Sequence, residues 1–384
     1  MQLRYNYRLD PTPGQRIALS RAFGCARTVF NDGLRIRQEA HAAGLPYITD
    51  GDLEKLVVTA AKRTSGREWL GEVSSVVLKQ SIRDLNTAYR NFFASVTGKR
   101  KGPKMAPPRF RSRKDNRHTI RLTRNGFSIR PSGRLYVAKV GEIPVHWSRG
   151  LPSTPSSVTV IKDAAGRYFA SFVVQTEPSE VLPETTAEIG VDLGLTHFAV
   201  LSDGRKISSP KFLRRAERKL RKAQQSLSRK EKGSNNRKKA VARVARLHAH
   251  VADSRRDHHH KLSTAIIREN QAVYVENLSV KALARTRLAK SVHDAGWAQF
   301  VAYLEYKATR YGRTFGKVDR FLPSSQTCSV CFVIDGPKPL NVRMWTCSGC
   351  QTIHDRDVNA ARIIVAAGRA ETQNACGGTV SPAV

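Results

Sequence analysis

The sequence predicts a multidomain protein that combines an α/β domain, a small antiparallel β-barrel and a cysteine-rich metal-binding insert. Short alternating runs between residues 119 and 175 are separated by turn dipeptides, as in successive hairpins. From residue 186 onward, strand patterns alternate with helical patterns, which indicates an α/β arrangement. Two Cys-x-x-Cys pairs interrupt this second half of the chain.

The composition is strongly basic. Among 384 residues, 66 Lys and Arg stand against 31 Asp and Glu, which gives a formal net charge of +35. This excess predicts a polyanionic partner, because Lys and Arg that meet phosphates release condensed counterions. The amino-terminal residues contain no apolar h-region and no apolar run reaches about 18 residues, so we expect neither a signal peptide nor a membrane span. Nucleic acid is therefore favoured over a membrane surface.

The first 95 residues predict one strand followed by a small helical unit. Residues 2–9 alternate as a strand does, and the following Asp-Pro-Thr-Pro-Gly breaks the pattern. Helical spacing then begins at Gln15. The apolar positions are Leu19, Phe23, Ala26, Phe30 and Leu34 in a first helix, and Leu78, Ile82, Leu85, Tyr89 and Phe92 in a second.

A basic stretch rich in Pro and Gly spans residues 96–124. It holds eleven Lys or Arg from Lys99 to Arg124 against one acid, Asp115. The runs TIRLT, FSIR, RLYVAK, SVTVIK and YFASFVVQ alternate as half-buried strands do, and turn dipeptides separate several of them. They predict an antiparallel sheet, closed as a barrel and ending near Thr176.

The remaining residues predict the α/β domain. The segments AEIGVDLG, HFAVLSDG, QAVYVENL and RTFGKVDRF have strand patterns, and helices are expected over residues 295–311 and from the segment HDRDVNAARIIVAAG. A long basic helical pair covers residues 211–270 and is broken at residues 232–236. Residues 211–256 hold 17 Lys or Arg and three acids, an excess that indicates nucleic-acid contact.

The cysteine spacing predicts a zinc site. Two Cys-x-x-Cys pairs are separated by fifteen residues, and each pair offers two thiolates that can share one ion. Four protein ligands close a tetrahedral shell and leave no position for water, so we expect one structural zinc ion rather than a catalytic one. The ligands are Cys328, Cys331, Cys347 and Cys350.

Three acids are candidates for the chemistry. Asp192 lies in an apolar strand between glycines, Glu276 ends another apolar strand, and Asp357 opens an apolar helix. A carboxylate placed in apolar surroundings needs a partner, and a divalent cation is the strongest one. Acids at strand ends and helix starts are often only caps, but three in this order predict a site for two Mg²⁺ ions about 3.5–4 Å apart.

Asp355 competes with Asp357 for the third position. Both lie in His-Asp-Arg-Asp, and only one of them can point into the same site. We favour Asp357 because it leads directly into the helix, and we expect Asp355 to be the helix N-cap.

The motifs resemble one family. The segments VDLG, HFAVLSDG, YVENLSVKAL, SSQTCSVC, RMWTCSGC and HDRDVNAAR, together with LDPTPGQ near the start, resemble the TnpB (OrfB-type) transposon-encoded proteins, which are similar to compact type V CRISPR effectors. The likeness covers almost the whole chain. Phe332 and Gln351 stand where the family commonly has glycine after each Cys-x-x-Cys, and Ile363 replaces the usual Asn.

The resemblance implies a domain plan and a mechanism. It implies an RNA-guided DNA endonuclease that cuts by a two-metal RuvC mechanism, with the acid triad mapping onto Asp192, Glu276 and Asp357. The implied parts are a wedge-type β-barrel (residues 1–10 and 96–178), an inserted helical recognition unit (11–95), a split RuvC (ribonuclease H-like) nuclease domain (186–320 and 352–370), a zinc ribbon (321–351) and a disordered tail (371–384). The implied partners are a guide RNA and double-stranded target DNA, and we expect a monomer in the prokaryotic cytoplasm or nucleoid.

Further residues are candidates for contact with nucleic acid. By family analogy, Tyr47, Lys79, Gln80 and Arg83 lie in the helical unit that reads a short DNA motif beside the target, although ordinary helix surface is an equal alternative for each. The basic stretches add Arg109, Arg111, Arg113, Lys222, Arg237 and Lys238.

Two other functions would use much of the same sequence. A transposase that joins strands would need the same carboxylates, so only its products would distinguish it. A nuclease-dead RNA-guided repressor would be expected to lose an acid, and none is missing here.

Overall fold

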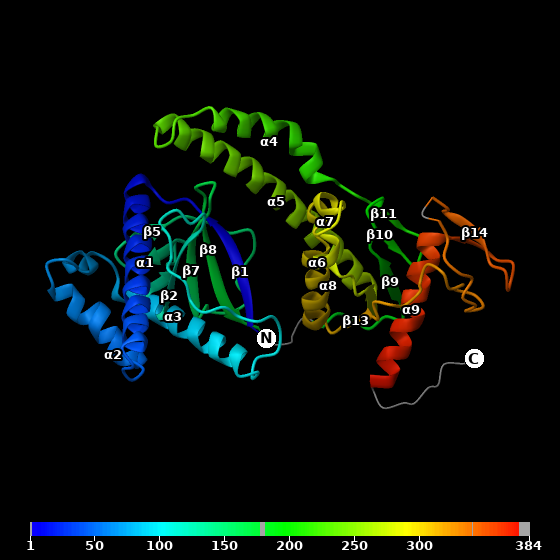
Figure 1. Ribbon diagram of the computed structural model, residues 1–384, viewed down its shortest axis with the longest axis horizontal. Coiled ribbons are helices and arrows are strands. Elements are labelled where there is room, and N and C mark those ends of the chain that lie inside the picture. The colour runs from blue at the N-terminus through cyan, green and yellow to red at the C-terminus, as the bar shows by residue number, and fades with distance from the viewer. Residues whose placement is uncertain (1, 177–180, 340, 376–384) are drawn as a thin grey trace. The chain divides into compact units, whose positions relative to one another are not determined.

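The computed structural model describes residues 2–176, 181–339 and 341–375 (Figure 1). The chain forms two compact units, Met1–Thr176 and Glu177–Val384. Residues 376–384 of the predicted disordered tail lie outside the described residues.

The first unit is built on an antiparallel sheet with the strand order β2-β7-β8-β1-β6. Its central pair is β1 (Gln2–Leu9) and β8 (Tyr168–Gln175), which are in register from Gln2 opposite Gln175 to Leu9 opposite Tyr168. Alternate residues of both strands enter one core, as the period of two predicts. The other strands are β2 (His118–Thr123), β6 (Val145–His146) and β7 (Ser157–Lys162).

The predicted barrel is not closed. The strands β3 (Phe127–Ile129), β4 (Leu135–Val137) and β5 (Gly141–Ile143) pair only with one another and form a separate sheet among the described residues. Closure would require continuous pairing around the unit. Strand β6, at one edge of the larger sheet, is only two residues long, and the sequence pattern of alternation does not reveal such a short edge.

Two long helices complete the core of the first unit. Helix α1 (Pro13–Ala42) begins in a capping box, in which Thr12 and Gln15 satisfy each other's backbone N–H. Helix α3 (Ser75–Val96) packs against α1 and β2. Between them lie α2 (Asp50–Glu54), a π-helical turn (Lys55–Ala60) and two 3₁₀ turns (Ala61–Arg63 and Glu68–Glu72), none of which the sequence pattern predicted.

The second unit is built on a mixed five-stranded sheet with the order β11-β10-β9-β12-β13. Strands β9 (Glu188–Asp192), β10 (His197–Leu201) and β11 (Lys206–Ser208) are antiparallel to their neighbours along the chain. Strand β12 (Ala272–Glu276) runs parallel to both β9 and β13 (Thr314–Val318). The carboxyl ends of β9, β12 and β13 therefore lie at the same end of the sheet.

Helices cover both faces of this sheet. On one face, α5 (Asn235–Glu269) and α8 (Trp297–Tyr311) pack on the odd-numbered residues of β9 and β12, such as Val191 and Val275. On the other face, α9 (Arg356–Ala375) packs on the even-numbered residues of β12. Helices α4 (Phe212–Ser228) and α5 form the predicted basic hairpin, and the short helices α6 (Val280–Leu283) and α7 (Ala289–Ala295) precede α8.

Small residues allow α9 to approach the sheet closely. A Cβ on Gly190 would lie 2.0 Å from the carbonyl oxygen of Ala361, and a Cβ on Gly368 would lie 2.2 Å from Cδ1 of Tyr274. Real Cβ atoms do not approach other atoms this closely, so glycine is required at both positions.

Helix α9 extends further than predicted. Residues 371–375 are helical, so the expectation of a tail that is disordered from residue 371 is wrong for this segment. Arg369 pairs with Glu188 of β9, and Oε1 of Glu371 accepts a hydrogen bond from the backbone N–H of Asp319 at 3.2 Å. These contacts anchor the last turns to the sheet. Among the described residues, no helix is long and apolar enough to cross a membrane.

Candidate active site

Two of the predicted acids end neighbouring parallel strands. Asp192 is the last residue of β9 and Glu276 the last of β12, and the register pairs Val191 with Val275 immediately before them. Because side chains alternate along a strand, Asp192 shares the face of Gly190 and Glu276 shares the face of Tyr274. Both carboxylates therefore lie on the face of the sheet that α9 covers.

The third predicted acid comes from α9. Asp357 is in the first turn of this helix, four residues before Ala361, which meets the sheet at Gly190. Residues four apart lie on the same side of an α-helix. The fold therefore brings acids 192, 276 and 357 to one end of the sheet, although they are far apart in the sequence.

The electrostatics of this end reflect the three acids. Burial, together with the charges of Glu276 and Asp357, raises the pKa of Asp192 from 3.8 to about 7, against a smaller lowering by Arg356. Burial also raises the pKa of Glu276. Acids that resist ionisation because they are buried, and in the case of Asp192 also because other carboxylates are close, are groups whose charged form a divalent cation stabilises.

Asp357 is paired with an arginine in this structure. Nη1 of Arg343 lies 3.1 Å and 3.2 Å from the two carboxylate oxygens of Asp357. Among the described residues, the carboxylates do not form a group whose ligand atoms all lie within 4.8 Å of one another, and only the four cysteines do. The three acids are thus neighbours, but Asp357 would have to exchange Arg343 for a metal ion.

Asp355 has a different set of partners. Its Oδ1 accepts from the backbone N–H groups of Asp357 and Val358, at 3.2 Å and 3.1 Å, and its Oδ2 accepts from Nζ of Lys206 at 2.6 Å. Burial alone would raise the pKa of Asp355, but the hydrogen bonds from Lys206 and these amides hold it below 3.8. This is the geometry of a helix N-cap.

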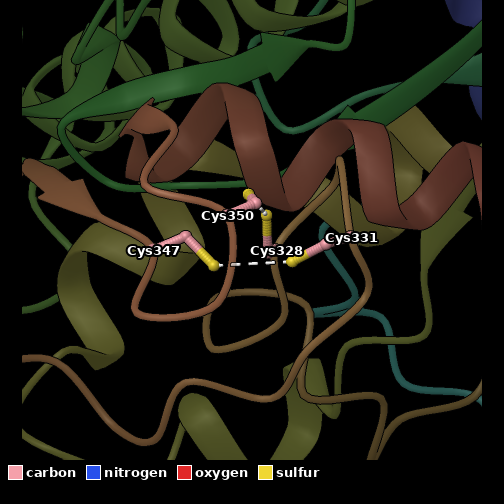
Figure 2. A group of neighbouring side chains, drawn as sticks. All are labelled: Cys328, Cys331, Cys347 and Cys350. Atoms are coloured by element: carbon pink, nitrogen blue, oxygen red, sulfur yellow. Dashed lines mark hydrogen bonds between the residues drawn. The ribbon is translucent and has the colours of Figure 1, made fainter.

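The four cysteines converge on one point (Figure 2). Sγ of Cys328 lies 3.6 Å from Sγ of Cys350, and Sγ of Cys331 lies 3.5 Å from Sγ of Cys347. Thiolates at about 2.3 Å from a zinc ion are about 3.8 Å from one another in a tetrahedron. The donor set therefore fits one tetrahedral zinc ion. The strands β14 (Met344–Thr346) and β15 (Ile353–Asp355) flank the second pair and lead into α9.

The residue after each Cys-x-x-Cys has a positive φ. Phe332 has φ of 60° and Gln351 has φ of 57°, in the left-handed region that favours glycine. A glycine at either position, which the family resemblance implied, would adopt this conformation without strain, and this chain adopts it with larger residues.

A cavity of about 450 Å³ lies beside Glu276. Its walls include apolar Leu193, Trp297 and Val301. Two basic residues also line it, Arg320 and Lys317, and Lys317 pairs with the wall residue Glu305 at 2.8 Å. The cavity adjoins the carboxyl ends of the strands, where the three acids meet.

The candidate nucleic-acid residues have diverse environments. Gln80 is buried, so it does not present its amide at the surface, and this position is a correction to the predicted set. Arg37 stacks over the exposed ring of Tyr47 at 4.4 Å, and Lys79 pairs with Glu54 at 2.8 Å. The residues Arg83, Arg109, Arg113, Lys222 and Lys238 are exposed.

Two of the predicted arginines have structural contacts. Arg111 stacks on Phe30 at 3.7 Å and approaches Asp84 at 3.8 Å. Arg237 donates through Nη1 to the carbonyl oxygens of Leu227 and Lys230, which closes the turn between α4 and α5.

The sequence did not single out three residues at this site, namely Arg343, His354 and Asn359. His354 and Asn359 are buried, and Arg343 is exposed and contacts Asp357. A polar Asn between Val358 and Ala360 in an otherwise apolar helix is a pattern that could have indicated a buried partner for Asn359.

Three family models match parts of this chain. Residues 171–287 match a family model described as "Probable transposase" (OrfB_IS605), and residues 297–364 match "Cas12f1-like, TNB domain". Residues 1–45 match a model described as "Helix-turn-helix domain", whereas the structure has one strand and one continuous helix there.

Full-length relatives are found among curated proteins. The chain is 44% identical to a "Putative RNA-guided DNA endonuclease" of Streptomyces pristinaespiralis, over 98% of this chain and 92% of that protein. It is 31% identical to "Putative RNA-guided DNA endonuclease InsQ" of Escherichia coli (strain K12), over 97% of this chain and 93% of that protein.

A solved structure has the same fold. It is the Cas12f1 chain of a complex with single-guide RNA and target DNA, which aligns with a TM-score of 0.57 and 14% identity over 91% of this chain and 82% of that chain. The 44% and 31% identities over nearly the whole chain show that it belongs to the TnpB-like family of RNA-guided DNA endonucleases.

Proposed function

We propose that this protein is a transposon-encoded, RNA-guided endonuclease that hydrolyses target DNA at Asp192, Glu276 and Asp357 with two Mg²⁺ ions. The observation that carries the proposal is the convergence of these acids from β9, β12 and the first turn of α9. Bound Mg²⁺ would supply the Lewis acid that activates water and stabilises the leaving oxygen.

The chain's own residues would prepare the site in two ways. Asp192 has to release its proton, which the raised pKa makes sensitive to pH near 7. Asp357 has to leave Arg343. The cavity beside Glu276 would hold the strand to be cut, with apolar walls for sugar and base and with Arg320 for phosphate.

Guide RNA and double-stranded target DNA would be held by the basic surfaces. Helices α4 and α5 carry many exposed Lys and Arg, including Lys222 and Lys238. Phosphate contacts of this kind make binding depend steeply on salt. Affinity of the protein for RNA should therefore fall by about 10-fold or more between low and moderate salt, and an affinity that hardly changes would contradict this role.

The decisive experiment is to purify the protein from its host, sequence the RNA that co-purifies, and test a plasmid that matches that RNA. We expect cutting with Mg²⁺, none with excess chelator, and none of an unmatched plasmid. Joined strands among the products would instead indicate a transposase, and target binding without cutting would indicate a repressor. We further propose a monomer that acts in the prokaryotic cytoplasm or nucleoid, which size-exclusion chromatography with light scattering and fractionation would test.

A further inference from the structure

The sheet fixes the body of α9 by close packing, but it holds the amino-terminal end of the helix through the ion pair between Lys206 of β11 and the cap residue Asp355. The close contacts lie at Ala361 and Gly368, whereas Asp357 is a full turn before Ala361. The position of Asp357 therefore depends on what holds the amino-terminal end of the helix. In the structure this end contacts the segment that carries the four cysteines, which we call the zinc ribbon (residues 321–351).

Asn359 of α9 forms two hydrogen bonds to this ribbon, one through each polar atom of its side-chain amide. Nδ2 donates to the carbonyl oxygen of Thr327 at 2.7 Å, and Oδ1 accepts from the backbone N–H of Ser329 at 2.8 Å. Asn359 is only 1% exposed. Thr327 and Ser329 are the two neighbours of Cys328, so one side chain clamps both sides of a predicted zinc ligand.

His354 makes a second connection. Its Nε2 lies 3.0 Å from Sγ of Cys328, and its ring packs on Trp345 with ring centroids 4.8 Å apart. The next residue in the chain is Asp355, which caps α9. The backbone thus leads from a side chain in contact with the cysteine cluster to the first turn of the helix within two residues.

We propose that Asn359 and His354 are positioning residues that couple the zinc site to the carboxylate site, so that bound zinc sets the position of Asp357. This inference rests on the proposed function, because it assigns Asp357 to the Mg²⁺ site. A four-cysteine hairpin needs its metal to keep its fold. Loss of zinc would loosen residues 327–329, release Asn359 and remove the anchor of the first turn of α9 on the ribbon, which would leave this end held by the Lys206–Asp355 ion pair.

Coupling between two binding sites is reciprocal. If zinc improves the affinity of the carboxylates for Mg²⁺, then Mg²⁺ must improve the retention of zinc by the same factor. Couplings of this kind typically amount to about 5-fold or more. Retention of zinc is thus a measure of the coupling that does not depend on cleavage.

The test compares the wild-type protein, bound to guide RNA, with four variants: Asn359→Ala, Asn359→Asp, Asp192→Ala and Ser348→Ala. Asn359→Ala removes the clamp, and Asp192→Ala removes a carboxylate without touching the ribbon. Ser348→Ala is the matched control, because Ser348 is a ribbon residue whose hydroxyl donates to Asp335 at 2.8 Å within the ribbon. Two quantities are measured: the affinity for zinc, by equilibrium competition with the dye 4-(2-pyridylazo)resorcinol with and without Mg²⁺, and the Mg²⁺ concentration for half-maximal plasmid cleavage.

In the wild type and in Ser348→Ala, we expect Mg²⁺ to protect the bound zinc by raising the affinity for zinc about 5-fold or more. In Asn359→Ala, this protection should disappear, and the Mg²⁺ concentration for half-maximal cleavage should rise by about the same factor. Asn359→Asp keeps the acceptor for Ser329 but loses the donor to Thr327, so its values should be intermediate. Asp192→Ala should hold zinc without any protection by Mg²⁺.

Two results would overturn the inference while leaving the nuclease intact. One is wild-type protein that cuts its target but has the same equilibrium affinity for zinc with and without Mg²⁺, a result that requires no Asn359 variant to fold. The other is Asn359→Ala with the wild-type Mg²⁺ requirement and protection. Failure of the wild type to cut at any Mg²⁺ concentration would instead refute the proposed function, and the inference with it.

Discussion

Gly190 of β9 lies against Ala361 of α9 so closely that a Cβ on residue 190 would come within 2.0 Å of the helix carbonyl oxygen. This contact sets the distance between the helix that carries Asp357 and the strand that carries Asp192. Because the obstacle is backbone, no side-chain rotation can relieve it.

Gly190→Ala should therefore displace α9 and destabilise the second unit by about 3 kcal/mol, the upper part of the range for overpacked cores. Thermal unfolding would show a lower Tm, and cleavage should be lost with the displaced acid. Gly150→Ala is the control, since a Cβ there meets nothing within 4 Å. A Gly190→Ala protein with wild-type Tm would show that the helix is not held as described.

The three acids should act as one unit. Asp192→Ala, Glu276→Ala and Asp357→Ala should each abolish cleavage and leave RNA binding largely intact, and double variants should lose no more than single ones. Asp355→Ala should keep substantial activity and lose about 1 kcal/mol of stability, the usual contribution of an N-cap. The measurement is plasmid cleavage beside urea unfolding. Retained activity in Asp357→Ala with loss of activity in Asp355→Ala would show that Asp355, not Asp357, is the third acid of the site.

The pKa of Asp192 predicts how stability depends on pH. In the Mg²⁺-free folded protein this pKa is raised from 3.8 to about 7, so between these values the folded state holds a proton that the unfolded state has released. The contribution of Asp192 to the free energy of unfolding should then be fully present below pH 3.8 and fall as pH rises toward 7. Asp192→Asn should flatten this part of the Tm profile, and Mg²⁺ should restore stability near pH 7. Profiles of the two proteins that run in parallel would contradict the shift.

The cysteine cluster should hold one zinc ion per chain. Cys347→Ser should lose it and lower the stability of the second unit, because a closed four-thiolate shell contributes directly to folding. Elemental analysis of fresh protein gives the stoichiometry. Cys25→Ser is the matched control, since Cys25 is buried in the first unit, and it should retain the metal. Fresh wild-type protein without zinc would refute the site.

Two residues of the ribbon, Phe332 and Gln351, have a left-handed backbone conformation that glycine would adopt with less strain. Gln351→Gly and Phe332→Gly should each stabilise the ribbon by up to about 1 kcal/mol, because glycine removes the Cβ strain of a positive φ. Gly336→Ala tests the reverse, since Gly336 has φ of 69° and open space around it, and it should destabilise. Chelator-dependent unfolding of the ribbon would measure all three. A loss of stability in Gln351→Gly would show that its side chain contributes more than the strain costs.

The sequence predicted the regular elements of the second unit well, for reasons that the structure shows. Strands β9 and β12 are apolar because helices cover both of their faces, and α9 has an apolar run because it lies on the sheet. Asp192, Glu276 and Asp357 could be recognised as candidates because each is a charged residue within or at the end of an apolar run. The cysteine spacing was equally readable, because the four ligands come from two short hairpins.

What the sequence could not predict depends on packing between distant segments. The pairing of Arg343 with Asp357 and the clamp at Asn359 exist only because the ribbon folds back onto α9. Burial of Gln80 results from the packing of α3, since helical periodicity does not say how wide the covered face is. The unclosed sheet of the first unit depends on edge strands too short to leave a pattern.

The position of α9 in the chain also has a consequence during synthesis on the ribosome. A nascent chain that has emerged through Glu276 already carries the basic helices α4 and α5 and two of the acids, but Asp357 follows only after the ribbon. Such a chain would be able to bind nucleic acid before it is able to cut it. Incomplete translation products that lack Asp357 would therefore not cut the genome. Ribosome-arrested chains of increasing length, assayed for binding and for cleavage, would show the two properties appearing at different lengths, and cleavage by a chain without Asp357 would refute this order.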